Sequence, residues 1–208
     1  ADGARRMTAP APPLLATEGL TMRFGGVVAV DRVSVSIDEG ELRCLIGPNG
    51  AGKSTFFRCL TGQYRPTSGR VLWRGKDVTG LDPFRMARLG IGIKTQVPAL
   101  FDGLPVVEGV RLAARRLHGE REARRLADEA LGRLGISHLA DRPAGLLAHG
   151  QRQLAELATV VAPGPDLVIL DEPTAGMGAE ETARTAGLIR ELNRDHAVVV
   201  VEHDMQFI

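Results

Sequence analysis

The stretch GPNGAGKS, residues 47–54, decides how the rest of the chain is interpreted. It fits the pattern G-x-x-x-x-G-K-[ST], in which glycines let backbone N–H groups turn inward onto phosphate oxygens. The apolar run ELRCLI (41–46) precedes it as a predicted strand, and a predicted helix with Phe56, Phe57 and Leu60 follows it. A plain glycine-rich turn between strand and helix is the alternative. The sequence favours a phosphate-binding loop, because the motif occurs in the context that it requires.

Each position of this loop has an expected part in holding a nucleoside triphosphate. Lys53 is expected to reach the β- and γ-phosphates, and the Ser54 hydroxyl is expected to reach Mg²⁺. The N-terminus of the following helix adds a partial positive charge. The predicted ATP-binding residues of the loop are Gly47, Pro48, Asn49, Gly50, Ala51, Gly52, Lys53, Ser54 and Thr55.

A second stretch, LVILDE (167–172), reads as a buried strand that ends in two carboxylates. Open α/β sheets bind ligands at the carboxyl edge of their strands. We therefore expect Asp171 to hold Mg²⁺ through its water shell, and Glu172 to polarise a water molecule. An acidic strand end that caps the next helix is the alternative. We favour the metal site, because a phosphate loop requires a metal partner.

The order of the predicted elements indicates an α/β fold. The first two predicted strands, VSVSI (33–37) and ELRCLI (41–46), lie on either side of a turn, and a mostly helical region follows at 105–134. After it come the strand LVIL (167–170), a helix from about Ala179 to Arg194, and the strand AVVVV (197–201). Continuous apolar strands separated by helices are typical of a parallel sheet that is covered on both faces.

The composition of the 208 residues is that of an ordinary globular chain, with 44% hydrophobic residues and a net charge of +1. This balance gives no whole-chain attraction to nucleic acid or anionic lipid, and no apolar run approaches the ~20 residues that span a bilayer. Cys44 and Cys59 fit a reducing cytosol and are expected to pack in the core. The Pro/Ala-rich residues 1–13 are predicted to be a disordered lead-in to one domain, residues 14–208.

A third motif runs from Leu147 to Gln151, LAHGQ, about twenty residues before Glu172. It resembles the L-S-G-G-Q signature of ATP-binding-cassette (ABC) proteins. The spacing predicts a helix from Gln151 onward that opens without a Ser or Asp cap. In that family the signature helix of one subunit points at the γ-phosphate held by the other subunit. The resemblance implies that ATP on a partner chain meets free N–H donors at the signature residues. These are Ala148, His149, Gly150 and Gln151.

Other positions match the ABC family one by one. Phe24 in LTMRFGG resembles the aromatic residue that stacks on adenine. Gln96 in KTQ resembles the loop glutamine that touches Mg²⁺ and senses the membrane partner. His203 in VVVEHD resembles the switch histidine that contacts the γ-phosphate. A lone Phe is usually core and a lone His is usually structural, but here the set occurs in the correct order from about Leu20 to Met205.

The resemblance implies a P-loop NTPase fold of ABC type. It comprises a mostly parallel core sheet, an N-terminal antiparallel β-subdomain and a helical subdomain over about residues 97–160. Within it, Glu172 and His203 would be catalytic. The implied Mg²⁺ contacts are Ser54, Gln96 and Asp171. Family members usually continue beyond this point of the fold, so the C-terminal end is expected to be truncated.

The implied function is that of an ATPase subunit of an importer, bound peripherally at the cytoplasmic side of the cell membrane. Its implied partners are a second ATP-binding subunit, transmembrane permease subunits and, indirectly, a periplasmic or extracellular solute-binding protein, with no nucleic acid. Two copies would enclose two Mg·ATP between them.

Two departures from the general family pattern indicate a subclass. Ala148 replaces the signature serine, and Gly178 in PTAGMGAEET replaces the aspartate of S-A-L-D. These features resemble the ATP-binding subunits of branched-chain amino-acid importers, and among them most closely the urea-type ones. Losing one hydrogen bond to a charged group costs about 1.5–3 kcal/mol. Such a loss would slow turnover without abolishing it, because the helix N–H groups remain.

Several alternatives stay open. A soluble ABC ATPase of translation or repair would need a second cassette or a coiled coil between Gln96 and Leu147, and the 208 residues hold neither. Ala148 and Gly178 also suit a nucleotide-binding regulator with little hydrolysis. The apolar VPALF (97–101) either docks a membrane subunit or packs the helical subdomain. A solvated helix face, favoured over a lipid or nucleic-acid site, is expected for Arg111, Arg115, Arg116, Arg121, Arg124 and Arg125.

Overall fold

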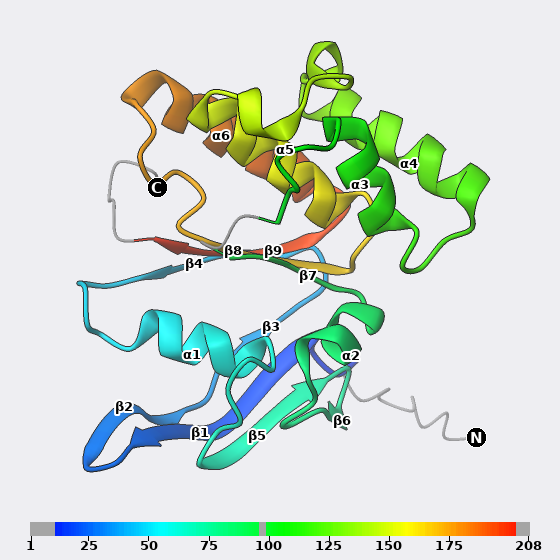
Figure 1. Cartoon of the computed structure of the whole chain (residues 1–208). Helices are drawn as coiled ribbons and strands as arrows, with labels where there is room; N and C mark the ends of the chain where they lie inside the picture. The colour runs from blue at the N-terminus through cyan, green and yellow to red at the C-terminus, as the bar shows by residue number, and fades with distance from the viewer. Residues whose placement is uncertain (1–10, 96–98, 203–208) are drawn as a thin grey trace, which may run out of the picture.

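A parallel sheet lies at the centre of the computed structural model, which describes residues 11–95 and 99–202 (Figure 1). Its strands run in the order β4-β9-β8-β7. Their bounds are β4 (Leu42–Ile46), β9 (Ala197–Glu202), β8 (Leu167–Asp171) and β7 (Ile91–Lys94). All three neighbouring pairs are parallel, so crossover connections join these strands, as parallel pairing requires.

A second, antiparallel sheet is built from the N-terminal part of the chain. Its strands are β1 (Leu15–Phe24), β2 (Val27–Val33), β3 (Ser36–Ile37), β5 (Ser68–Trp73) and β6 (Lys76–Asp77), with β2, β3 and β5 all pairing with β1. The fold predicted from the sequence, a parallel core with an antiparallel β-subdomain and helices, is therefore confirmed.

The strand predicted over residues 33–37 is divided into two in the structure. Val33 ends β2, and β3 begins only at Ser36. Between them the Thr17 hydroxyl donates a hydrogen bond to the Val33 carbonyl at 3.0 Å and accepts one from the Val35 N–H at 3.1 Å. The Thr17 N–H still donates a hydrogen bond to the Val35 carbonyl at 2.8 Å, so the side chain supplements the backbone pairing where the strand is interrupted. Alternating hydrophobicity alone does not reveal this.

The parallel sheet is covered on both faces, as predicted. Figure 1 shows α3, α4, α5 and α6 on one face, and α1, α2 and the antiparallel sheet on the other. Alternate residues of β8 divide between the two cores: Val168 and Leu170 pack with the helices, and Leu167 and Ile169 pack with the other layer. The helices are α1 (Lys53–Leu60), α2 (Pro83–Arg88), α3 (Val106–Ala114), α4 (Glu120–Arg133), α5 (His149–Val161) and α6 (Ala179–Leu192).

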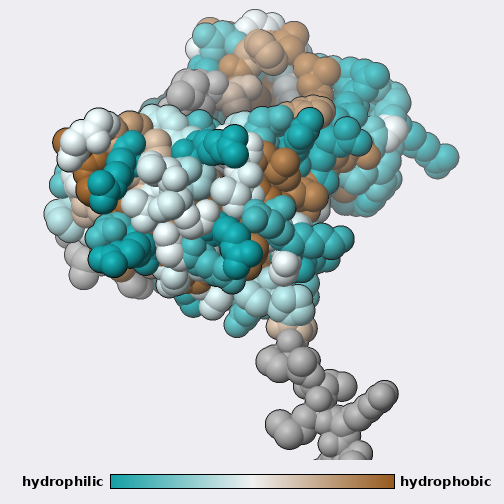
Figure 2. Space-filling view, turned by 90° about the horizontal axis from the view of Figure 1, so that it is seen from below, coloured by the Kyte–Doolittle hydropathy of each residue, from teal (hydrophilic) through white to brown (hydrophobic). Residues whose placement is uncertain are grey.

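Most of the remaining sequence expectations about packing are also met. Cys44 lies half-buried in β4, and Cys59 lies buried in α1. Arg115 and Arg116, which follow α3, and Arg121, Arg124 and Arg125 of α4 are exposed as predicted, and Arg125 pairs with Glu122 and Glu129 of its own helix. Arg111 of α3 departs from the prediction, because its side chain is only 20% exposed and pairs with Glu108 and Glu120. Seen from below, the molecule is largely hydrophilic, with hydrophobic residues gathered in separate patches (Figure 2).

Candidate nucleotide-binding and catalytic site

The predicted phosphate loop connects β4 to α1. Gly50 and Gly52 have φ angles of +81° and +88°, a region that L side chains rarely adopt. A Cβ atom at Gly52 would also lie 2.1 Å from the Ala29 carbonyl oxygen, so only glycine fits there. Among residues 11–95 and 99–202, no side chain caps α1, whose first residue is Lys53. An uncapped helix N-terminus after a glycine-rich turn is a suitable place for a phosphate group.

Lys53 folds back over this loop. Its side chain is nearly buried, and Nζ donates hydrogen bonds to the carbonyl oxygens of Gly47 at 2.5 Å and Pro48 at 3.0 Å. The ammonium group is therefore held by oxygen acceptors of the loop itself. Phosphate oxygens would offer it acceptors that carry a full negative charge.

Asp171 ends β8 with a buried carboxylate. Within the described part of the chain, its Oδ1 has no hydrogen-bond partner. Burial raises the pKa of Asp171, and the nearby Glu172 raises it further, while Arg58 and Lys53 act in the opposite direction. A buried oxygen without a protein partner suits water molecules on a cation, and Mg²⁺ characteristically keeps such waters when it binds one or two carboxylates and phosphates. The donors at this site thus fit Mg²⁺.

Glu172 has an unusual backbone conformation. Its φ angle is +48°, in the left-handed region, and its N–H donates a hydrogen bond to the Val201 carbonyl at 2.9 Å. This conformation turns the chain directly after Asp171, so that the two neighbouring carboxylates leave the backbone in different directions. Strained positions of this kind are concentrated at functional sites.

We expect Asp171→Asn to stabilise the nucleotide-free protein. Because the pKa of Asp171 is raised by folding, stability is lost as pH rises from the ordinary carboxyl pKa through the raised value. An amide does not ionise, so the free energy of unfolding should be higher in the variant than in the wild type at pH 7. Urea titrations in EDTA from pH 4 to pH 8 would measure this gain, which should shrink toward the acid end. The exposed Asp128→Asn is the control and should show no gain; a destabilised Asp171→Asn protein would contradict the expectation.

Sequence reasoning missed one buried carboxylate beside this site. Glu202 ends β9, and its Oε1 accepts hydrogen bonds from the Thr174 hydroxyl at 2.8 Å and the Thr174 N–H at 3.4 Å. It thereby holds the loop that follows Glu172. The available signal was a carboxylate directly after the apolar run AVVVV, the same pattern that drew attention to Asp171.

The signature helix begins earlier than predicted. α5 starts at His149, with Ala148 as its N-cap, and not at Gln151. The reason is that Gln151 occupies the third position of the helix, where its Oε1 accepts a hydrogen bond from the Ala148 N–H at 3.1 Å. This is half of a capping box. Gln151 is therefore already used locally, whereas Ala148 has no side-chain oxygen with which to cap the first turn.

The start of α5 packs against the segment that follows Asp171 and Glu172. His149 Nε2 lies 2.9 Å from the Ala175 carbonyl oxygen. A Cβ atom at Gly150 would lie 2.5 Å from Glu181 Oε1, so the glycine leaves room for that carboxylate. Within the described part of the chain, no hydrogen bond connects the signature residues to the phosphate loop.

The other predicted site residues divide into two groups. Phe24 is 45% exposed at the end of β1, with its ring edge-to-face against Tyr64 at a centroid distance of 5.5 Å, so it is not a core residue. Gln96 and His203 lie outside the described residues.

Comparisons with known proteins agree with this geometry. The family model described as "ABC transporter" matches residues 30–175. The chain is 37% identical to the high-affinity branched-chain amino acid transport ATP-binding protein BraF of Pseudomonas aeruginosa, and 38% identical to LivG of Salmonella typhimurium. Each alignment covers 94% of this chain and 84% of the relative.

Solved structures show the same likeness. The ADP conformation of MJ1267, an ATP-binding cassette of an ABC transporter, superimposes with a TM-score of 0.83 at 29% identity, covering 93% of this chain and 82% of that one. The phosphate loop, the carboxylate pair and these matches together confirm the resemblance predicted from the sequence: the chain belongs to the ABC transporter family, as an ATP-binding subunit that hydrolyses ATP.

Proposed function

We propose that the chain powers an ABC importer for branched-chain amino acids, or for a similar small polar solute such as urea, at the cytoplasmic side of the membrane. The observation that carries the proposal is the identity to BraF and LivG, which are named as branched-chain amino acid transport proteins, over 94% of the chain. Across residues 11–95 and 99–202, none of the helices has the length and apolar character needed to cross a bilayer. In the proposed importer, permease subunits would carry the solute.

In the proposed cycle, two such chains enclose ATP between them. The phosphate loop of one chain would hold the triphosphate, and the uncapped first turn of α5 in the other would face the γ-phosphate. Ser54, Asp171 and Gln96 would hold Mg²⁺, which when bound neutralises charge on the phosphate oxygens. Glu172 would orient or deprotonate the attacking water, and His203 would contact the transferring phosphoryl group.

A groove beside α2 and α3 supports docking of a permease subunit. Its volume is about 710 Å³, and Phe84 of α2, Phe101, and Leu112 and Leu117 on and after α3 line it with exposed apolar surface. Exposed apolar surface of this kind marks interaction sites, and an amphipathic helix fits such a groove. The permease's cytoplasmic helices are the proposed occupants.

The described residues of the apolar stretch 97–101 are compatible with both of the roles considered for it. Leu100 is buried in the helical core, whereas Phe101 is 66% exposed and lines the groove. Val97 and Pro98 lie outside the described residues. One residue thus packs the helical layer, and its neighbour is available to a partner.

Transport by the assembled protein tests the proposal. The full-length chain, co-expressed with its cognate permease subunits and binding protein, would be placed in proteoliposomes and given Mg·ATP. We expect ATP-dependent uptake of labelled leucine, and loss of uptake when Phe84 and Phe101 are both changed to Ser. Leu146→Ser is the matched control, because Leu146 is equally exposed but lies outside the groove. Uptake of urea alone would reassign the solute, and ATP-independent uptake would overturn the proposal.

We expect Phe24→Ala to weaken ATP binding through loss of adenine stacking. Stacking of a base on an aromatic side chain contributes about 1–3 kcal/mol, so affinity should fall roughly 5- to 150-fold. Titration calorimetry with ATP and with inorganic triphosphate would measure it. Only ATP should bind more weakly, since triphosphate has no base to stack. Equal ATP affinity in variant and wild type would return Phe24 to a role in packing against Tyr64.

A further inference from the structure

A buried ion pair joins the core sheet to the signature helix. Lys94 is the last residue of β7, and Glu156 lies in the second half of α5. Their Nζ and Oε2 atoms are 3.5 Å apart, and their side chains are only 5% and 6% exposed. Burial lowers the pKa of Lys94, and Glu156 opposes that effect. The pair is therefore a directional, water-excluded contact between two layers that otherwise meet through apolar side chains.

Glu156 also extends this contact toward the groove. Its Oε1 lies 3.4 Å from Arg152 Nε, one turn earlier on α5. Arg152 Nη1 lies 2.7 Å from Asp102 Oδ1, and Nη2 donates a hydrogen bond to the Leu100 carbonyl at 3.4 Å. The chain of charges Lys94–Glu156–Arg152–Asp102, which we call the relay, thus runs from the end of β7 through α5 to the loop beside the exposed Phe101.

The energetics of the relay indicate a role other than stability. Bringing two charges out of water costs several kcal/mol per ion, so a well-packed apolar pair of similar volume is often as stable or more stable. What an ion pair adds is a preferred geometry. Apolar contacts such as those of Leu154 and Leu157 tolerate small rotations of a helix, whereas a charge pair at 3.5 Å is weakened by them.

Two members of the relay, Lys94 and Glu156, lie close in the sequence to residues of the proposed site. Lys94 comes two positions before Gln96, and Glu156 comes five positions after Gln151 on one continuous helix. Five residues of α-helix span about 7.5 Å as a stiff rod. Fixing Glu156 against β7 therefore also fixes where the start of α5 lies.

We propose that Glu156 is a positioning residue that, through Lys94 and Arg152, sets the angle at which Ala148–Gln151 are presented to nucleotide on a partner chain. This inference rests on the proposed function, in which the first turn of α5 faces ATP across a dimer. Arg152 and Asp102 make the loop beside Phe101 part of the same unit, so a permease helix docked in the groove would act on the same contact.

The test separates this role from a purely structural one. Because Glu156→Gln alone would leave Lys94 buried without a counter-charge and could unfold the chain, the pair is replaced together, as Lys94→Met with Glu156→Leu. The replacement is made in a full-length Glu172→Gln chain, so that hydrolysis does not release any dimer. The exposed pair of Glu18 and Arg70, changed to Leu and Met, is the matched control.

The ATP affinity of the single chain is expected to stay unchanged in the double variant, because the phosphate loop is intact. Its thermal stability should also stay unchanged, because an apolar pair of similar volume replaces the ion pair. Dimerisation with Mg·ATP, followed by sedimentation, should weaken at least about fivefold, the lower range of coupling between sites. The Glu18/Arg70 control should dimerise like its parent. A double variant that dimerises as tightly as the parent overturns the role of Glu156, and so does one that loses ATP affinity and stability together. A Glu172→Gln parent that stays monomeric with ATP bound overturns the proposed dimer first, and the role of Glu156 with it.

Discussion

A Glu172→Gln protein is expected to bind ATP at wild-type affinity, to hydrolyse it at least about 100-fold more slowly, and to accumulate as a dimer. General-base catalysis contributes about 10²–10⁴-fold, and the amide keeps the shape of the side chain but does not take a proton from water. Asp171, whose Oδ1 has no hydrogen-bond partner among the residues that the structure describes, would remain available for Mg²⁺. Phosphate release and light scattering with excess Mg·ATP measure the two effects on a full-length chain.

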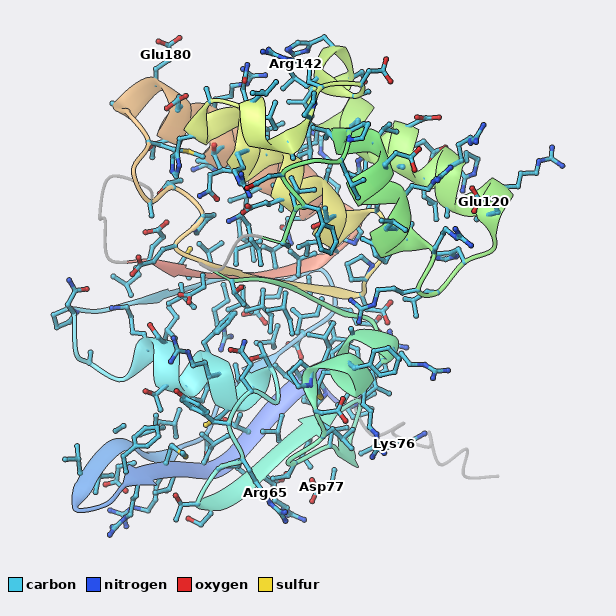
Figure 3. All side chains as sticks on the ribbon, in the orientation of Figure 1. Arg65, Lys76, Asp77, Glu120, Arg142 and Glu180 are labelled. Atoms are coloured by element: carbon cyan, nitrogen blue, oxygen red, sulfur yellow. The ribbon has the colours of Figure 1, made fainter. Side chains whose placement is uncertain are left out.

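The control for this variant is Glu180→Gln. Glu180 points away from the molecule at the start of α6 (Figure 3), so its loss of charge should leave turnover unchanged. Removal of Mg²⁺ should return the Glu172→Gln dimer to monomers. Wild-type hydrolysis in this variant would show that Glu172 is not the catalytic carboxylate.

Lys53→Ala is expected to lower ATP affinity by roughly 10- to 150-fold. A hydrogen bond to a charged group contributes about 1.5–3 kcal/mol, and no other lysine occurs in the loop to replace Lys53. The variant also loses the two hydrogen bonds to the Gly47 and Pro48 carbonyls, so the loop should loosen even without nucleotide. Titration calorimetry measures the affinity.

Lys76→Ala is the matched control for this experiment. Lys76 lies exposed on β6 and is labelled in Figure 3, on the antiparallel sheet. The Lys76→Ala substitution removes the same charge from the chain but leaves the phosphate loop intact, so ATP affinity should be unchanged. If both lysine variants bind ATP like the wild type, the phosphate-loop assignment fails.

The sequence was most informative at positions where the phosphate-binding motif and the backbone geometry require the same residue. Gly52 is required both by its positive φ and by the nearby Ala29 carbonyl, and it is also the glycine that the motif specifies. Apolar runs such as residues 197–201 predicted the parallel strands, because both faces of that sheet are buried. Residue patterns could therefore predict much of the parallel core, whereas the antiparallel β-subdomain was predicted through the family resemblance.

What the sequence did not reveal depends on side chains that substitute for regular patterns or meet from distant segments. Thr17 divides a predicted strand, and Gln151 shifts a helix start by capping its own turn. The groove and the relay are assembled from segments far apart in the chain, and their members have no spacing in common. Lys94 and Glu156 each look like ordinary charged residues until the fold buries them together.

The close approach of Gly52 to Ala29 has a consequence for how nucleotide is received. Phe24 and Val27 are paired at the end of the hairpin that β1 and β2 form, and Ala29 lies two residues further along β2. The aromatic ring proposed for adenine and the loop proposed for phosphates are thus parts of one packed unit, whose spacing is set before any ligand arrives. A receptor preorganised in this way gives up little conformational entropy when it binds, so more of the contact energy is retained as affinity.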